Sequence, residues 1–96
     1  MNWLVKCTIT ELLSRRRERV FYVGGTTSAS VDLRAAAHRG VYDAELGAGR
    51  WRMYYASTKR VYYQECKLLE KFRHTGHRSS CNADSSGFVY VLCRRL

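Results

Sequence analysis

Glu65 is the residue whose type and position point most directly to chemistry. It lies four residues after Val61 and three before Leu68, so on a helix the three side chains share one apolar face. Burying an unpaired carboxylate costs several kcal/mol, so Glu65 needs a partner. Three partners remain open: an arginine in a salt bridge, a proton on the acid itself, or a metal ion at the edge of a cleft.

The chain is strongly basic, which favours a polyanionic partner. It has 17 Lys and Arg against 8 Asp and Glu, a formal net charge of +9, and 13 of the 17 are Arg. A guanidinium group can grip a phosphate through two parallel hydrogen bonds, whereas an ammonium group is a hydrated point charge. Nucleic acid is therefore the expected partner rather than a membrane surface. The alternative is a basic protein whose charge only keeps it soluble.

The helices and strands that position these residues are indicated by the spacing of hydrophobic residues and by glycines and serines. Proline gives no boundary signal because the chain has none. The predicted elements are strands at 3–9 and 20–23, a helix at 31–39 capped by Ser30 and ended by Gly40, a loosely patterned stretch at 41–49 with room for a short helix, a strand at 51–56, a helix at 60–72 capped by Ser57 or Thr58, and a strand at 88–93. We expect the first two strands to pair antiparallel through the charged connection at 15–19.

These elements predict one domain over residues 1–96, because a chain of this length has no room for a second core. The expected class is α/β in the broad sense (α+β), with a small central, mostly antiparallel sheet of three to four strands flanked by helices. The last strand is expected as an addition or an edge extension of that sheet.

Four features follow one another in a recognisable order. Tyr22-Val23-Gly24 ends the second predicted strand, Arg34 and His38 lie one turn apart on the next helix, Glu65 precedes two leucines, and Asn82 follows that helix. From about residue 20 to 82, this order resembles the GIY-YIG nucleases. The resemblance implies a GIY-YIG-like β-β-α-(α)-β-α fold with an extra C-terminal strand.

The resemblance also implies a divalent-metal-dependent endonuclease that hydrolyses phosphodiester bonds in DNA. Tyr22 would assist the attacking water, Arg34 would stabilise the phosphate, Glu65 would bind Mg²⁺ or Mn²⁺, and Asn82 would fix local geometry. His38 would contact the phosphate or orient Arg34. One carboxylate suffices because Mg²⁺ usually keeps several waters and takes phosphate oxygens as further ligands.

One departure from the family concerns a tyrosine. The first predicted strand contains none where the GIY element would place it. The alternatives for that role are Tyr54, Tyr55, Tyr62 and Tyr63. The missing tyrosine also motivates a second hypothesis, a non-catalytic basic nucleic-acid-binding or protein-interaction module that keeps the nuclease-like fold.

Several cations outside the catalytic set are candidates for contacts with nucleic acid, DNA more than RNA. They are Arg15, Arg16, Arg17, Arg19, Arg39, Lys59 and Arg60. The four arginines at 15–19 have an alternative role, which is to protect a sheet edge from aggregation. A homodimer or a protein partner is left open.

The sequence is that expected of a cytoplasmic, soluble protein without a membrane partner. Its start lacks the pattern of a signal peptide, and the longest apolar stretch, 88–93, is far shorter than a membrane span. Cys7, Cys66, Cys81 and Cys93 contain no Cys-x-x-Cys pair, so they are predicted to be reduced thiols. A zinc site formed by Cys66, His74, His77 and Cys81 would fit no standard ligand spacing.

Overall fold

The computed structural model describes residues 3–72 and 85–95. Along the chain the elements are strand β1 (Leu4–Lys6), helix α1 (Ile9–Leu13), the short 3₁₀ helix η1 (Arg17–Arg19), strand β2 (Val20–Thr26), helix α2 (Asp32–Leu46), strand β3 (Trp51–Thr58), helix α3 (Val61–Phe72) and strand β4 (Gly87–Arg94). Asn82, expected at the candidate site, and His74, His77 and Cys81 of the zinc alternative lie outside the described residues.

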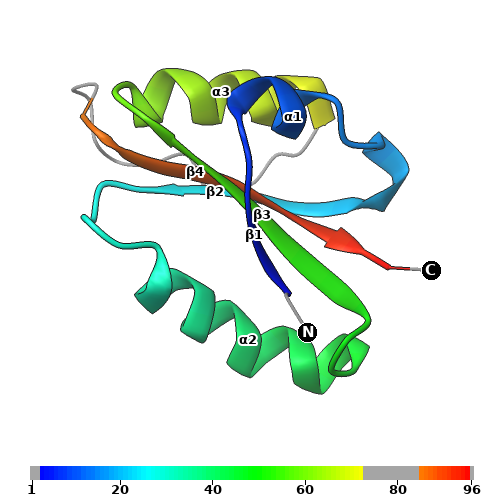
Figure 1. The fold of residues 1–96 in the computed structure, drawn as a ribbon. Coiled ribbons are helices and arrows are strands. Elements are labelled where there is room, and N and C mark those ends of the chain that lie inside the picture. The colour runs from blue at the N-terminus through cyan, green and yellow to red at the C-terminus, as the bar shows by residue number, and fades with distance from the viewer. Residues whose placement is uncertain (1–2, 73–84, 96) are drawn as a thin grey trace.

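The four strands form one sheet in the order β1-β3-β4-β2. Strand β4 is antiparallel to both of its neighbours, β3 and β2, whereas β1 is parallel to β3. Helices α1 and α3 lie on one face of the sheet and α2 lies on the other (Figure 1). The predicted α+β class, with a small, mostly antiparallel sheet flanked by helices, is confirmed.

The predicted hairpin between the first two strands is wrong, because β1 and β2 are the two edges of the sheet. Helix α1 separates them. The Glu11 N–H donates to Thr8 Oγ1 at 3.1 Å, and the Thr8 N–H donates to Glu11 Oε1 at 3.0 Å. This reciprocal capping box starts a helix at Ile9, where the strand was expected to continue, and turns the chain away from β1.

Strand β4 is central rather than the addition or edge extension expected from the sequence. Its side chains alternate between two cores: Val89, Val91 and Cys93 pack with α1 and α3, and Tyr90 and Leu92 pack with α2. All five are at most 6% exposed. A nearly continuous apolar run suits a strand that is buried on both faces, which explains why this segment occupies the middle of the sheet.

Helix α2 does not end at Gly40 as predicted, and the stretch at 41–49 does not hold a separate helix. Instead α2 continues to Leu46 and ends at Gly47, whose φ is 95°. A glycine inside a helix costs about 1 kcal/mol relative to alanine. At a single position this cost is too small to end the helix. Ser30 does contribute at the start, where its hydroxyl accepts the Asp32 N–H at 3.1 Å.

Helix α3 begins close to its predicted position. Thr58 Oγ1 accepts the Arg60 N–H at 3.0 Å just before the helix starts at Val61. Among the described cysteines, Cys7, Cys66 and Cys93 are free thiols. None of the helices in the described ranges has both the length and the apolar character needed to cross a bilayer.

Candidate functional site

Tyr22 reaches the α2 face of the sheet because strand β2 contains an irregularity. The register with β4 shifts between Val20 and Tyr22. Val20 and Val23 pack on the α3 side, whereas Phe21 and Tyr22 both pack on the α2 side. A bulge inserts one extra residue, so two consecutive side chains can share a face.

Three side chains from three elements meet on this face. His38 Nε2 of α2 and Tyr90 Oη of β4 form a hydrogen bond at 2.8 Å. The Tyr22 ring lies 4.8 Å from the His38 ring and is stacked at 6.3 Å on the Tyr90 ring, measured between centroids. We call Tyr22, His38 and Tyr90 the aromatic cluster. Tyr42, one turn after His38, borders it with its ring centroid 6.0 Å from that of His38.

The absence of a side chain at Gly24 leaves the space that the Tyr90 ring occupies. The two residues are paired across β2 and β4. A Cβ atom on Gly24 would lie 2.5 Å from Tyr90 Oη and 2.6 Å from Tyr90 Cζ, closer than real side chains approach. The glycine that follows Tyr22 and Val23 is therefore required by the packing of Tyr90, and β2 continues through it to Thr26.

His38 and Tyr90 are both uncharged near pH 7. Burial raises the pKa of Tyr90 well above its usual value; Tyr22 adds to the rise and Arg34 opposes it. Burial also lowers the pKa of His38 below 6.5, and the nearby Arg34 charge lowers this pKa further. Tyr90 therefore keeps its proton, and His38 is an uncharged imidazole with one nitrogen able to accept a proton.

Glu65 has the buried position that the helical pattern predicted. It is 3% exposed, on the side of α3 that faces the sheet. A Cβ atom on Gly25 would lie 3.5 Å from Glu65 Cδ, so the carboxylate sits directly beneath strand β2. Its charge contributes to the raised pKa of Tyr90, after burial and Tyr22.

Tyr90 and Glu65 thus approach the same short stretch of β2 from opposite faces. Gly24 faces Tyr90, and Gly25 faces Glu65 and Val61. Because β2 is an edge strand, this stretch of the sheet has a neighbouring strand on one side only. Arg34, exposed in the first turns of α2, lies close enough for its charge to affect both His38 and Tyr90.

The donor set around Glu65 is limited. Within residues 3–72 and 85–95, no group of three or more His, Cys, Asp or Glu side chains is arranged to hold a metal ion. A single carboxylate remains chemically suited to Mg²⁺ or Mn²⁺ when waters and phosphate oxygens complete the coordination.

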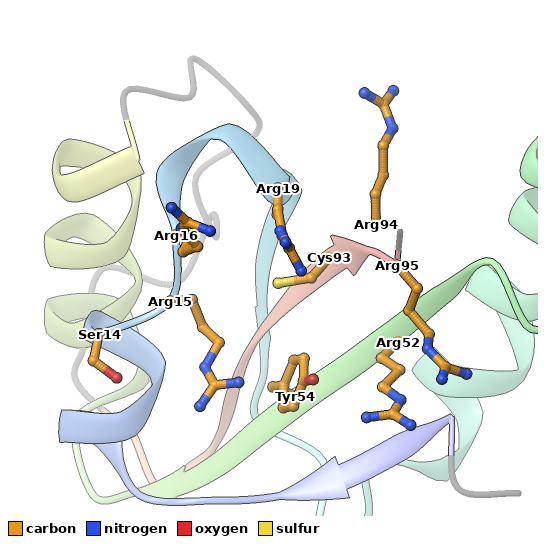
Figure 2. A pocket seen from close by; sticks show the side chains of 9 residues that line it. All are labelled: Ser14, Arg15, Arg16, Arg19, Arg52, Tyr54, Cys93, Arg94 and Arg95. Carbon is orange, nitrogen blue, oxygen red and sulfur yellow. The ribbon is translucent and has the colours of Figure 1, made fainter.

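The predicted nucleic-acid contacts do not share one surface. Arg15, Arg16 and Arg19 line a hollow beside α1 (Figure 2), and Arg17 borders a different one next to Phe72. Lys59 lines a separate hollow of about 700 Å³ at the opposite end of the sheet.

Two more of these cations already make contacts within the fold. Arg39 forms an ion pair with Asp43 at 3.2 Å, and its guanidinium lies 5.1 Å from the Trp3 ring centroid. The guanidinium of Arg60 lies 4.2 Å from the ring centroid of Tyr63.

Sequence reasoning missed Tyr90, the hydrogen-bond partner of His38. Its signal was present: a tyrosine inside the apolar run Val89 to Cys93 must bury its hydroxyl, and a buried hydroxyl needs a polar partner. The sequence left this role open among Tyr54, Tyr55, Tyr62 and Tyr63. None of them contacts His38 through a ring or a hydrogen bond in the described residues, whereas Tyr90 does both.

Comparison of the chain with protein-family models, curated proteins and solved structures gives no match. The functional conclusion depends on the geometry of the residues themselves.

Proposed function

We propose that this protein is a divalent-metal-dependent endonuclease that hydrolyses phosphodiester bonds in DNA, with its centre at the aromatic cluster and the adjacent stretch of β2. The observation that carries the proposal is the hydrogen bond between His38 and Tyr90, 2.8 Å long, with the Tyr22 ring against His38. It joins two residues of the predicted site, Tyr22 and His38, to a third that supplies a buried hydroxyl.

In this proposal Tyr90 takes the role of the tyrosine missing from the GIY-YIG resemblance. In the predicted arrangement the first strand carries this tyrosine and pairs antiparallel with the strand that ends in Tyr22-Val23-Gly24. Strand β4 pairs in this way with β2, and Tyr90 lies opposite Gly24. We infer that the strand expected first in the family comes last in this chain, as in a circular permutation.

In the proposed reaction, His38 takes the proton of the attacking water. If its Nε2–H donates to Tyr90 Oη, Nδ1 is left with a free lone pair that can accept this proton. Tyr90 is then a positioning residue that holds the imidazole in the required tautomer. The Tyr22 hydroxyl orients the water, and the exposed Arg34 guanidinium binds the phosphate and stabilises its developing negative charge.

Glu65 would hold the Mg²⁺ or Mn²⁺ ion, whose positive charge would stabilise the phosphate oxygens. Glu65 lies across β2 from the aromatic cluster, so an ion held there would have to act at the open edge of this strand, beside Gly24 and Gly25. A cytoplasmic location belongs to the same proposal and is supported by the free thiols of Cys7, Cys66 and Cys93.

The test is DNA cleavage by purified protein with Mg²⁺ or Mn²⁺, using nicked, branched and duplex substrates. Glu65→Gln is expected to lower the rate by about 100-fold or more, since loss of a metal ligand removes charge stabilisation in the transition state. Glu70→Gln is the matched control, because Glu70 is an exposed carboxylate on the same helix. Equal rates for Glu65→Gln and the unmodified protein would contradict the proposal.

A second candidate is a basic nucleic-acid-binding module without cleavage. The 3% exposure of Glu65 favours it, because a buried carboxylate can serve the fold alone. This candidate predicts DNA binding that weakens steeply with salt and no cleavage with any metal. A protein-interaction module would instead ignore nucleic acid in the same experiment.

A further inference from the structure

Six arginines surround one hollow on the face of the sheet opposite the aromatic cluster. The hollow measures about 330 Å³, and we call it the arginine pocket. Its arginines are Arg15, Arg16, Arg19, Arg52, Arg94 and Arg95. They come from the segment between α1 and β2, from β3 and from the end of β4 (Figure 2). These segments are far apart in the sequence, so the fold creates this concentration of charge.

Arg52 supplies a donor in the pocket that has no acceptor among the described residues. Its Nε atom is buried, and in the part of the chain that the structure describes it has no hydrogen-bond partner. A buried charged donor without an acceptor is costly, because it has lost its hydration and gained nothing in return. An anion in the pocket would supply the acceptor.

Two groups beside the pocket, Glu18 and Cys93, bear on this charge. Arg16 forms an exposed ion pair with Glu18 at 3.2 Å, which is screened by solvent. Cys93 forms part of the wall. Burial raises the pKa of its thiol to about 11, although Arg15 and Arg19 act to lower it, so Cys93 carries no negative charge near neutral pH.

The chemistry of the walls favours phosphate over a base or an apolar ligand. The Tyr54 ring in the pocket is covered by Arg15, whose guanidinium carbon lies 4.5 Å from the ring centroid. The ring is therefore occupied and offers little room for stacking. Guanidinium groups from several directions match the oxygens of phosphate, which accept paired hydrogen bonds.

We propose that the arginine pocket binds backbone phosphates of a nucleic-acid strand, at a site separate from the proposed catalytic centre. A strand fits better than a small polyphosphate because the charge extends beyond the pocket. Figure 2 shows the exposed Arg94 side chain pointing away from the other arginines, and its guanidinium carbon lies 5.6 Å from the Phe21 ring centroid. Phosphate contacts carry no base information, so binding is independent of sequence. The site requires neither metal nor cleavage.

The test measures binding of fluorescently labelled duplex DNA by anisotropy across a range of salt concentrations, in a chelator that removes divalent metals. Arg19→Gln combined with Arg52→Gln is compared with Arg50→Gln combined with Lys71→Gln. The control pair removes the same charge from exposed positions outside the pocket. Circular dichroism melting checks that each variant is folded, and Arg15→Gln with Arg19→Gln replaces the first pair if Arg52→Gln does not fold.

Each lost phosphate contact should weaken binding about fivefold at physiological ionic strength, so the pocket pair should lose about 25-fold. For the pocket pair, the slope of log K against the logarithm of the salt concentration should become less steep by about 2. The control pair should change far less. Equal losses in the two pairs, or unchanged binding in the pocket pair, would overturn the proposal.

Binding of inorganic pyrophosphate, measured for the same variants, distinguishes a small polyphosphate from a nucleic-acid backbone as the ligand of the pocket. If the pocket pair abolishes pyrophosphate binding while DNA binding is unchanged, the pocket serves a small polyphosphate and the proposal is wrong. Because no metal is present, absence of cleavage activity would leave this result intact. Failure of the proposed nuclease and failure of the arginine pocket are therefore distinguishable.

Discussion

At the scale of single residues, the partners of His38 determine what it can do. An isolated histidine on a helix face is commonly a partly exposed residue without a role. Here burial and the Arg34 charge lower the pKa of His38, and Tyr90 holds Nε2. An imidazole kept neutral and fixed in orientation is what proton transfer requires.

The pH dependence of cleavage should reflect this lowered pKa. We expect the rate to reach half its neutral-pH value below pH 6.5, the ordinary pKa of histidine, because His38 becomes protonated only at lower pH. Cleavage rates measured under single-turnover conditions between pH 5 and 8 give the profile. A rate that already falls by half at or above pH 6.5 would contradict the assignment of His38 as the base.

Replacing Tyr90 by Phe distinguishes the two tautomers. The ring that fills the space above Gly24 is kept, so the cost to stability should be about 1 kcal/mol, that of one hydrogen bond. If His38 donates to Tyr90, the bond favours the charged imidazolium, and its loss should lower the pKa of His38 further. NMR titration of the His38 ring, assigned with His38→Gln, measures this. A rise would mean that Tyr90 is the donor, contrary to the proposed mechanism.

At the scale of elements, two glycines differ in what surrounds them. Gly24 in β2 is in contact with Tyr90, whereas a Cβ atom on Gly40 in α2 would meet nothing within 4 Å. Gly24→Ala should therefore destabilise the fold by about 1–3 kcal/mol through overpacking. Gly40→Ala should stabilise it by about 1 kcal/mol, because alanine favours a helix interior. Urea unfolding compares the two, and similar effects of both substitutions would contradict the packing of Tyr90 on Gly24.

Several local signals in the sequence were sufficient to predict individual helices and strands. The patterns of apolar residues located β3, α3 and β4, and the hydroxyls of Ser30 and Thr58 marked two helix starts. The capping box at Thr8 and Glu11 was equally legible and would have predicted α1. By contrast, the irregularity that turns Tyr22 to the α2 face depends on how β2 pairs with β4. The sequence of β2 alone therefore does not predict it.

At the scale of the whole molecule, β4 joins the two halves of the sheet. It pairs with both β3 and β2, which do not pair with each other. A chain ending before Gly87 should therefore lose its cooperative unfolding transition. Removal of residues 1–6, which takes away the short edge strand β1, should lower stability but keep cooperativity. Circular dichroism melting tests both, and a cooperative transition in the chain without β4 would contradict this prediction.

The sequence by itself determined the local part of this protein: most of its helices and strands, the buried position of Glu65 and an excess of arginine. The elements and the burial of Glu65 follow from relations between residues two to four positions apart, which a linear pattern contains, and the arginine excess follows from composition. Only the tertiary structure decided the strand order, the meeting of Tyr22, His38 and Tyr90, and the gathering of six arginines around one hollow. The physical reason is that strand pairing joins segments distant along the chain. Several pairings satisfy the same apolar pattern, and the choice among them is made by packing of the complete core.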